Sequence, residues 1–367
     1  MAIRCGARAA CGTVPPPRPL PPFMRVLIVK LSALGDVVHA LPAVRLLQAY
    51  RPGVHLTWVV EQRVAGILEG QGIDAVVPID TRRLRADLRA GRLGEVAAAV
   101  GELRHRLATP FDLILDLQGN TKSGVVARLA RGRRRVGLPR RLCREWLNTW
   151  LIAEQAPGVA DHVVDQAGGV VAHALGIAWE GVAPPYLRTS GVAAAGPPRV
   201  ALINGASWET KLWPVASFVA LGQWLAARGF AVVVPWGDER EHHRAVAIAS
   251  EIGPAAVVPP RGSLAELAAL LATCRLAVGG DTGPTHIAWA VGTPTVSLYG
   301  PNPAVRNGPR GPTHRRLQAP VECSPCWGKR CPTNNFICMA SITVEAVVAA
   351  AADLLDSAPP PRPGDSP

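Results

Sequence analysis

Residues 275–300 read RLAVGGDTGPTHIAWAVGTPTVSLYG, and this stretch decides the fold. Apolar runs at 276–278 and 295–299 each end in glycine, so both have the composition of buried strands. The residues DTGP at 281–284 predict a helix start, with Asp281 or Thr282 as N-cap and proline near the first helical position. The stretch therefore predicts a strand, a tight loop, a helix and a second strand.

The tight loop of this unit is a candidate phosphate site. In an open parallel sheet such a loop lies at the carboxyl end of a strand, where ligands bind and where the helix presents free N–H groups. Gly279, Gly280 and Gly283 would let a diphosphate approach the main chain, and His286 follows within one turn. The alternative is structural: glycine turns occur in any such unit, and a single histidine is commonly part of the packing.

The same alternation extends over most of the chain. The apolar run 24–29 (MRVLIV) leads into a loop and a helix with periodicity over 40–50. Further strands are predicted at 56–60, 75–78, 112–117, 199–203, 231–235 and near 257. Further helices are predicted at 82–107, 263–274 and 343–355; two others begin near 122 and near 239, and one ends near 228. Strands that alternate with helices through short joints predict doubly wound parallel sheets, here as two Rossmann-like halves across a cleft.

Proline and glycine content divides the chain into segments. We predict a disordered leader at 1–23, a first domain at 24–185, a linker at 186–198, a second domain at 199–356 and a disordered tail at 357–367. The leader lacks an apolar segment of signal-peptide length, and no stretch reads as a transmembrane helix.

The charge of the chain is uneven. The formal net charge is +12, and 49% hydrophobic and 18% charged residues describe a globular protein. Residues 122–144 contain nine basic residues and no acidic one, which favours an anionic partner. This segment contains no interleaved aromatics and no known nucleic-acid motif, so a small acidic molecule or an anionic membrane surface fits at least as well. The third possibility is that these arginines form a solvated face that binds no ligand.

The eight cysteines of a chain without an export signal indicate reduced thiols in the cytoplasm. Four of them, Cys323, Cys326, Cys331 and Cys338, fall in the segment CSPCWGKRCPTNNFIC. Their spacing could hold a structural metal, although only the first pair has the usual step between metal ligands. Packed thiols without a metal are the alternative.

A second candidate site residue follows the first predicted strand. Lys30, Gly35 and Asp36 come at the carboxyl edge of that strand, just before a helix. A carboxylate at this edge can serve as a general base if it is held close to an acceptor hydroxyl. The alternative for Asp36 is an ordinary helix N-cap.

Five motifs together resemble glycosyltransferase family 9, the ADP-heptose:lipopolysaccharide heptosyltransferases. They are VKLSALGDVVHALPA (29–43), DLQGNTKS (116–123), ETKLWP (209–214), VPWG (234–237) and GGDTGPTHIAWAVGTPTVSLYGP (279–301). The first and last motifs are more similar to heptosyltransferase I than to heptosyltransferase II, whereas the cysteine segment is more similar to heptosyltransferase II. The resemblance spans residues 24–355.

The resemblance implies a GT-B fold, with an amino-terminal acceptor domain and a carboxyl-terminal domain for the sugar nucleotide. It implies inverting transfer of L-glycero-D-manno-heptose from ADP-heptose to a Kdo residue of the lipopolysaccharide inner core, with no cofactor required. The implied partners are ADP-heptose, an acceptor of the Kdo-lipid A type and the anionic inner leaflet of the inner membrane, on its cytoplasmic side. No nucleic-acid partner is expected.

The resemblance also implies roles for individual residues. Asp36 matches the family's proposed base. The implied donor-binding residues are Ser207, Lys211, Glu241, Asp281, Thr282, Gly283 and His286. Lys30 matches a lysine beside the acceptor, and Lys122 and Arg144 are the first choices for the acceptor's carboxylates and phosphates.

Two other functions stay open at this point. One keeps the fold and the base but uses a different acceptor, as a heptosyltransferase II or a protein O-heptosyltransferase would. The other is a nucleotide-binding module without catalysis. A carboxylate placed across a cleft from a phosphate loop favours an enzyme, because a binding module needs no base there.

Overall fold

The computed structural model describes residues 24–158, 160–189 and 196–357. The predicted leader at 1–23, part of the predicted linker and all but the first residue of the predicted tail lie outside the described residues. In the described part of the chain, no helix is long and apolar enough to cross a membrane.

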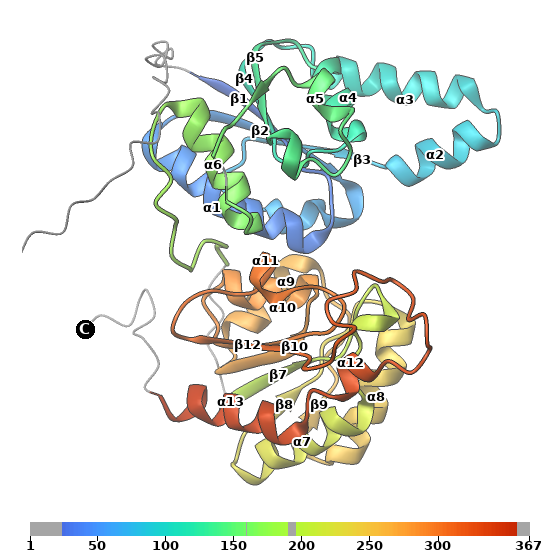
Figure 1. The fold of residues 1–367 in the computed structure, drawn as a ribbon, viewed down its shortest axis with the longest axis vertical. Helices are drawn as coiled ribbons and strands as arrows, with labels where there is room; N and C mark the ends of the chain where they lie inside the picture. The colour runs from blue at the N-terminus through green and yellow to red at the C-terminus, as the bar shows by residue number, and fades with distance from the viewer. Residues whose placement is uncertain (1–23, 159, 190–195, 358–367) are drawn as a thin grey trace, which may run out of the picture.

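Two parallel sheets with helices packed around them form the described part of the chain, one above the other in Figure 1. The first sheet has the strand order β3-β2-β1-β4-β5-β6. Its strands are β1 (Arg25–Val29), β2 (His55–Glu61), β3 (Ala75–Ile79), β4 (Phe111–Asp116), β5 (Gly132–Gly137) and β6 (Glu154–Gln155). The chain order reverses between β1 and β4, which pair in parallel with Val26 opposite Leu113. This reversal is the switch point at which open sheets bind ligands.

The second sheet repeats the arrangement, with the order β12-β11-β10-β7-β8-β9. Its strands are β7 (Arg199–Ile203), β8 (Ala231–Val233), β9 (Ala256–Val257), β10 (Leu276–Gly280), β11 (Thr295–Tyr299) and β12 (His314–Gln318). Here the switch point lies between β7 and β10. Residues 275–300 form β10, α10 (Gly283–Ala290) and β11, with Thr282 as N-cap and Pro284 in the first turn, as predicted. The two Rossmann-like halves of a GT-B fold are thereby confirmed.

Helices cover the sheets on both faces. Those of the first half are α1 (Leu34–Tyr50), α2 (Thr81–Arg89), α3 (Leu93–Arg106), α4 (Thr121–Leu129), α5 (Asn148–Leu151) and α6 (Val163–Leu175). Those of the second half are α7 (Val215–Ala227), α8 (Glu239–Ile252), α9 (Leu264–Ala272), α10, α11 (Ala304–Asn307), α12 (Ile337–Ala340) and α13 (Val344–Asp356). The last helix, α13, packs on α7 and on strands of the second sheet.

The two halves share one apolar cluster. It joins Val37 and Leu41 of α1 to Ile287 and Trp289 of α10, all of them buried. Burial of apolar surface stabilises by roughly 25 cal/mol per Å². The cluster therefore holds the starts of α1 and α10 against each other, and this contact positions the site described below.

The structure corrects two predicted helices and shows two strands that the sequence did not predict. The predicted helix at 82–107 is two helices, α2 and α3, which a turn containing Gly91 at φ +70° separates. The helix predicted from periodicity at 40–50 begins earlier, at Leu34, so Asp36 lies in its first turn. Strands β5 (GRRRVG) and β12 (HRRLQ) were not predicted, because their arginines interrupt the apolar pattern by which buried strands are identified.

Candidate functional site at the contact of two helix starts

The site lies where the starts of α1 and α10 meet, at the carboxyl edges of the two sheets. A Cβ built on Gly35 would lie 2.7 Å from Cδ2 of His286, and one built on Gly283 would lie 2.6 Å from Cδ2 of Leu34. Real Cβ atoms do not come this close to other atoms, so only glycine fits at both positions without a shift. The contact brings the first turn of α1, which contains Asp36, against the start of α10, whose N-cap is Thr282.

Asp281 is the centre of a buried hydrogen-bond network. Its side chain is 4% exposed, and its carboxylate accepts from Nζ of Lys211 at 2.7 Å and from Nε2 of His286 at 3.0 Å. The carboxylate also accepts from Nδ2 of Asn302 at 2.6 Å and from Nδ2 of Asn307 at 2.7 Å. Burial alone would raise the pKa of Asp281, but the His286 hydrogen bond and the Lys211 charge outweigh it and hold that pKa well below its usual range.

The two asparagines of this network were not predicted from the sequence. Asn302 follows β11 and Asn307 ends α11, so both lie beyond the carboxyl end of a strand next to β10. That position was a usable signal, since the carboxyl ends of parallel strands meet at one edge. In the described residues, Oδ1 of each asparagine and Nδ1 of His286 are buried without a hydrogen-bond partner. The network therefore has unused polar atoms beside the α10 start.

Lys211 reaches the network from the loop after β7. It belongs to the 3₁₀ turn η3 (Glu209–Lys211), which packs so tightly on β10 that a Cβ on Gly280 would lie 2.8 Å from the Lys211 carbonyl oxygen. The ammonium group lies 4.4 Å from the ring centroid of Trp208, a cation–π distance. Lys211 is thus held with its ammonium group beside the loop that joins β10 to α10.

Glu241 and Ser207 lie further along the same sheet edge. Glu241 is in the first turn of α8, and its carboxylate accepts from the N–H of Gly237 at 2.7 Å. It also fills the space beside Gly205, where a Cβ would lie 2.2 Å from Cδ of Glu241, and its burial raises its pKa. Ser207 is exposed on the loop after β7, and no contact places it in the Asp281 network.

Asp36 lies on the first-half side of the same helix contact, one residue after Gly35, which packs against His286. The alternative that Asp36 is the helix N-cap is wrong: Ala33 is the N-cap, and Asp36 is three residues into the helix start, where its half-buried carboxylate accepts from the N–H of Ala33 at 3.0 Å. Gln118 fixes the preceding loop, because its side-chain oxygen accepts from the N–H groups of Leu31 and Ser32. Asp36 therefore follows a loop that is held in place, and among the described residues its second carboxylate oxygen accepts no hydrogen bond.

The three predicted acceptor-side cations share the carboxyl edge of the first sheet but differ in environment. Nζ of Lys30 donates to the Leu117 carbonyl at 2.7 Å, and burial lowers its pKa. Nζ of Lys122 donates to Oγ1 of Thr81 at 3.2 Å. Arg144 is exposed, and its backbone N–H donates to the carbonyl of Gly119 at 2.9 Å. Lys30 is thus the most enclosed of the three and the nearest to Asp36 along the chain, whereas Lys122 is half-buried and Arg144 is exposed.

The arginine-rich segment is not a uniform anion-binding face. Arg134 pairs with Glu154 at 2.5 Å, and Arg135 donates to the backbone carbonyls of Ala127 and Ala130. These two guanidinium groups hold β5 in the fold. The arginines that remain exposed are Arg128, Arg131, Arg133, Arg140, Arg141 and Arg144.

The structure does not support the metal site that the cysteine spacing suggested. Cys323 and Cys326 are exposed, Cys338 is buried, and all four cysteines of the segment are free thiols. Among the described residues, no group of three or more histidine, cysteine, aspartate or glutamate side chains could hold a metal ion.

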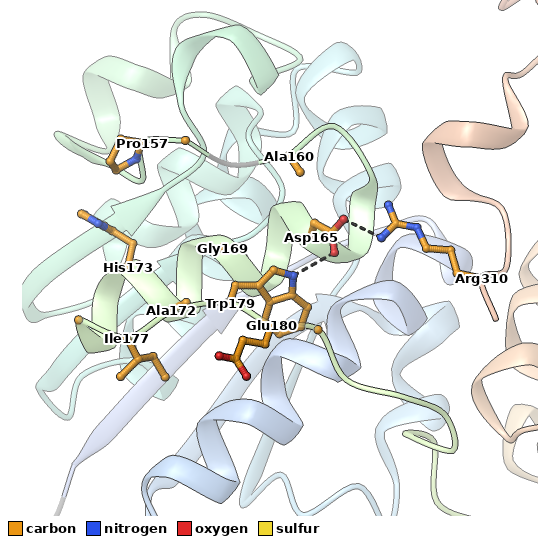
Figure 2. Close-up of a pocket in the computed structure, with 13 residues that line it drawn as sticks. Pro157, Ala160, Asp165, Gly169, Ala172, His173, Ile177, Trp179, Glu180 and Arg310 are labelled. Atoms are coloured by element: carbon orange, nitrogen blue, oxygen red, sulfur yellow. Dashed lines mark hydrogen bonds and ion pairs between the residues drawn. The ribbon is translucent and has the colours of Figure 1, made fainter. Parts of the chain in front are cut away.

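A cavity of about 810 Å³ lies away from this network, beside α6 (Figure 2). Figure 2 shows Asp165 of α6 between Trp179, whose Nε1 donates to it at 2.9 Å, and Arg310, which pairs with it at 2.7 Å. Arg310 comes from the second half, so this ion pair is a further link between the halves. None of the predicted site residues lines this cavity, and we place the site at the helix contact instead.

Buried histidines near the site predict a pH dependence of stability. Burial lowers the pKa of His162 and of His314 to about 4, and it lowers that of His39, whose two ring nitrogens have no partner among the described residues. The folded state keeps these rings neutral, whereas the unfolded chain binds protons below pH ~6.5. The contribution of these histidines to the free energy of unfolding is therefore fully present above that pH. It falls as the pH drops towards 4, by up to about 1.4 kcal/mol per pH unit for each histidine.

Urea unfolding of the wild type and of His39→Leu between pH 7.5 and pH 5 tests this expectation. The variant should lose less free energy of unfolding on acidification, because it has one proton fewer to bind on unfolding. Equal slopes for the two proteins would show that His39 is not neutral in the folded state.

Comparison with known proteins agrees with this geometry. Residues 100–337 match the profile of glycosyltransferase family 9 (heptosyltransferase). Lipopolysaccharide heptosyltransferase 1 of Pseudomonas aeruginosa is 35% identical over 314 residues, which are 84% of this chain and 87% of that protein. The structure of E. coli heptosyltransferase WaaC with ADP superposes with a TM-score of 0.78 at 28% identity, covering 90% of this chain and 100% of that one. The structure of the same enzyme with ADP-2-deoxy-2-fluoro heptose gives 0.76 at 28% identity, covering 90% and 99%. The family resemblance found in five sequence motifs is therefore confirmed, and the chain belongs to glycosyltransferase family 9, the heptosyltransferases.

Proposed function

We propose that this protein transfers L-glycero-D-manno-heptose from ADP-heptose to a Kdo residue of the lipopolysaccharide inner core, with inversion at the anomeric carbon. The observation that carries the proposal is the contact of the α1 start with the α10 start, in which Gly35, the chain neighbour of Asp36, packs against His286. The names of the relatives support the heptose donor and the lipopolysaccharide acceptor.

The donor side is the second half of the chain. The N–H groups of Thr282 and Gly283, at the positive end of α10, would bind the diphosphate of ADP-heptose. Lys211 would add a positive charge that stabilises the diphosphate as it departs. Glu241 would accept hydrogen bonds from the ribose hydroxyls, and Ser207 would border the same donor. His286, held by Asp281 through Nε2, would turn its free Nδ1 towards the donor.

The acceptor side is the first half. The acceptor hydroxyl would attack the anomeric carbon while Asp36 takes its proton, and the bond from that carbon to the phosphate oxygen would break, with the electron pair leaving on ADP. Lys30, Lys122 and Arg144 would bind the carboxylate and phosphate groups of a Kdo-lipid A type acceptor. We assign residues 24–185 to the acceptor domain and 199–356 to the donor domain. A lipid-linked acceptor of this kind places the reaction at the cytoplasmic face of the inner membrane.

Incubation with ADP-heptose and Kdo₂-lipid A, followed by mass spectrometry of the lipid, tests the proposal directly. We expect the mass of one added heptose, and none when the donor is omitted. Transfer only to an acceptor that already carries a heptose, or to a protein, would assign the chain a different acceptor within the family. ADP binding without any transfer would favour a non-catalytic module.

A further inference from the structure

Three large apolar side chains stand together on the surface of the first half. Trp146 is 50% exposed, Leu147 is 42% exposed and Trp150 is 76% exposed. The two indole rings contact each other edge to face, with 5.1 Å between their centroids. Single exposed apolar residues are ordinary, but three neighbours with two tryptophans among them form a patch of the kind that marks an interaction surface. We call Trp146, Leu147 and Trp150 the tryptophan patch.

The patch is exposed because its segment is anchored, not because it is loose. Asn148, at the start of α5, is 1% exposed, and its Nδ2 donates to Asp116 at 2.6 Å and to the Asn120 carbonyl at 2.7 Å. On the next turn, Leu151 packs so closely on α4 that a Cβ on Gly124 would lie 2.7 Å from its Cδ1. With Asn148 and Leu151 turned inward, the helical geometry leaves Trp150 on the outer face, and Trp146 is exposed beside it in the turn that precedes α5.

Positive charge surrounds the patch. Arg140 and Arg144 are exposed, and among the described residues neither guanidinium group has a hydrogen bond or an ion pair. Arg141 is also exposed but pairs with Asp161 at 2.8 Å. The acidic neighbour, Glu145, accepts from the N–H of Thr121 at 2.9 Å and is thereby turned to the protein. Indoles next to unpaired arginines match a bilayer surface, where rings lie at the headgroup level and guanidinium groups bind lipid phosphates.

The patch also has a defined place relative to the site. The N–H of Arg144 donates to Gly119 and Glu145 contacts Thr121, so the segment packs on the loop between β4 and α4. That loop is at the carboxyl edge of the first sheet, the edge that also carries Lys30 and Lys122. A membrane that contacts the patch would therefore lie next to the acceptor side of the cleft.

We propose that Trp146, Leu147 and Trp150, together with Arg140 and Arg144, dock the protein on an anionic lipid bilayer, with the tryptophans inserted at the headgroup level. The choice of a lipid-linked acceptor rests on the proposed function, but the docking surface itself rests on the exposed residues. Docking keeps the acyl chains of the acceptor in the bilayer while its sugar end reaches Asp36.

Co-sedimentation with vesicles tests the docking surface. The wild type should bind vesicles of phosphatidylethanolamine and phosphatidylglycerol more tightly than vesicles of phosphatidylcholine. The double variant Trp146→Ser/Trp150→Ser should bind the anionic vesicles about tenfold or more weakly, because two large apolar side chains no longer leave water. Trp327→Ser is the matched control, since Trp327 is 52% exposed but lies elsewhere, and its binding should be unchanged. Thermal unfolding of each variant checks that it is folded.

Equal vesicle binding by the wild type and the double variant would overturn the proposal. The proposal would also be overturned if the double variant lost binding to single-stranded RNA at physiological salt but kept its binding to vesicles. The patch would then be a stacking platform for bases. Arg140→Gln should weaken binding to anionic vesicles and reduce its dependence on salt.

A transfer assay separates this proposal from the proposed function. The double variant should transfer heptose to a fully deacylated acceptor at the wild-type rate but lose transfer to an acceptor embedded in vesicles. Equal loss on both acceptors would overturn the docking role, since the patch would then act in the cleft itself. If the wild type transferred to neither acceptor, the proposed function would fail, and the vesicle measurements would still decide whether the patch binds lipid.

Discussion

Asp36→Asn should lower the rate of heptose transfer by about 10²- to 10⁴-fold, since this is the usual loss when a positioned acid or base is removed. The affinity for ADP should stay unchanged, because the proposed donor contacts come from the second half of the chain. An asparagine can still accept the N–H of Ala33, so the capping contact survives and the variant should be as stable as the wild type. Turnover measured with Kdo₂-lipid A and ADP binding measured by calorimetry check the two halves of this expectation.

Asp80→Asn is the matched control for this experiment. Asp80 follows β3 at the same edge of the first sheet and caps α2 by accepting from the N–H groups of Arg82 and Arg83. Its substitution removes one carboxylate and keeps one cap, as at position 36, but it should leave the transfer rate unchanged. Near-normal turnover of Asp36→Asn would remove Asp36 from the role of base and leave it only the hydrogen bond to the N–H of Ala33 at the start of α1.

Asp281→Asn should lower the free energy of unfolding by about 3–5 kcal/mol, the usual cost of removing one partner from a buried ion pair. The variant leaves the buried Lys211 ammonium without its carboxylate, and it leaves the amides of Asn302 and Asn307 with a weaker acceptor. It should also weaken ADP binding, because both Lys211 and His286 lose the group that orients them. Denaturant unfolding and calorimetry provide the two measurements.

The exposed pair of Arg315 and Asp353 provides the comparison. The two side chains are 35% and 55% exposed, so solvent screens their attraction, and Asp353→Asn should cost less than about 1 kcal/mol. If Asp281→Asn were no more destabilising than Asp353→Asn, the network around Asp281 would not be the stabilising centre described above. The combination of Asp281→Asn with Lys211→Gln should recover part of the loss, since no unpaired charge then stays buried.

Most of the sheet architecture could be predicted because buried parallel strands leave a simple signal. The runs at 24–29, 112–117 and 276–280 are mainly apolar and end in glycine or polar loops. Strand β5 leaves no such signal, since Arg134 and Arg135 bend away to an acid and to carbonyl groups that only the fold brings within reach. The same applies to β12, an edge strand on which Arg315 reaches Asp353 on α13.

The candidate site was predictable to the extent that its residues lie in local motifs. Lys30, Asp36 and the loop at 281–286 each follow a strand, and the topology of parallel sheets brings such ends to one edge. Asn302, Asn307 and Gln118 were missed because each acts through one carbonyl or amide group on a partner far away in the sequence. The tryptophan patch was missed for a related reason: the outward orientation of Trp146 and Trp150 follows from the inward anchoring of Asn148.

The glycine contact between α1 and α10 limits how this enzyme can evolve. A methyl group at position 35 or 283 would push the two halves apart. We therefore expect a substitution at either glycine to require a compensating change at His286 or Leu34 in the other half. We therefore expect substitutions that adapt the site to another sugar to be tolerated at exposed positions such as Ser207 rather than at the two glycines.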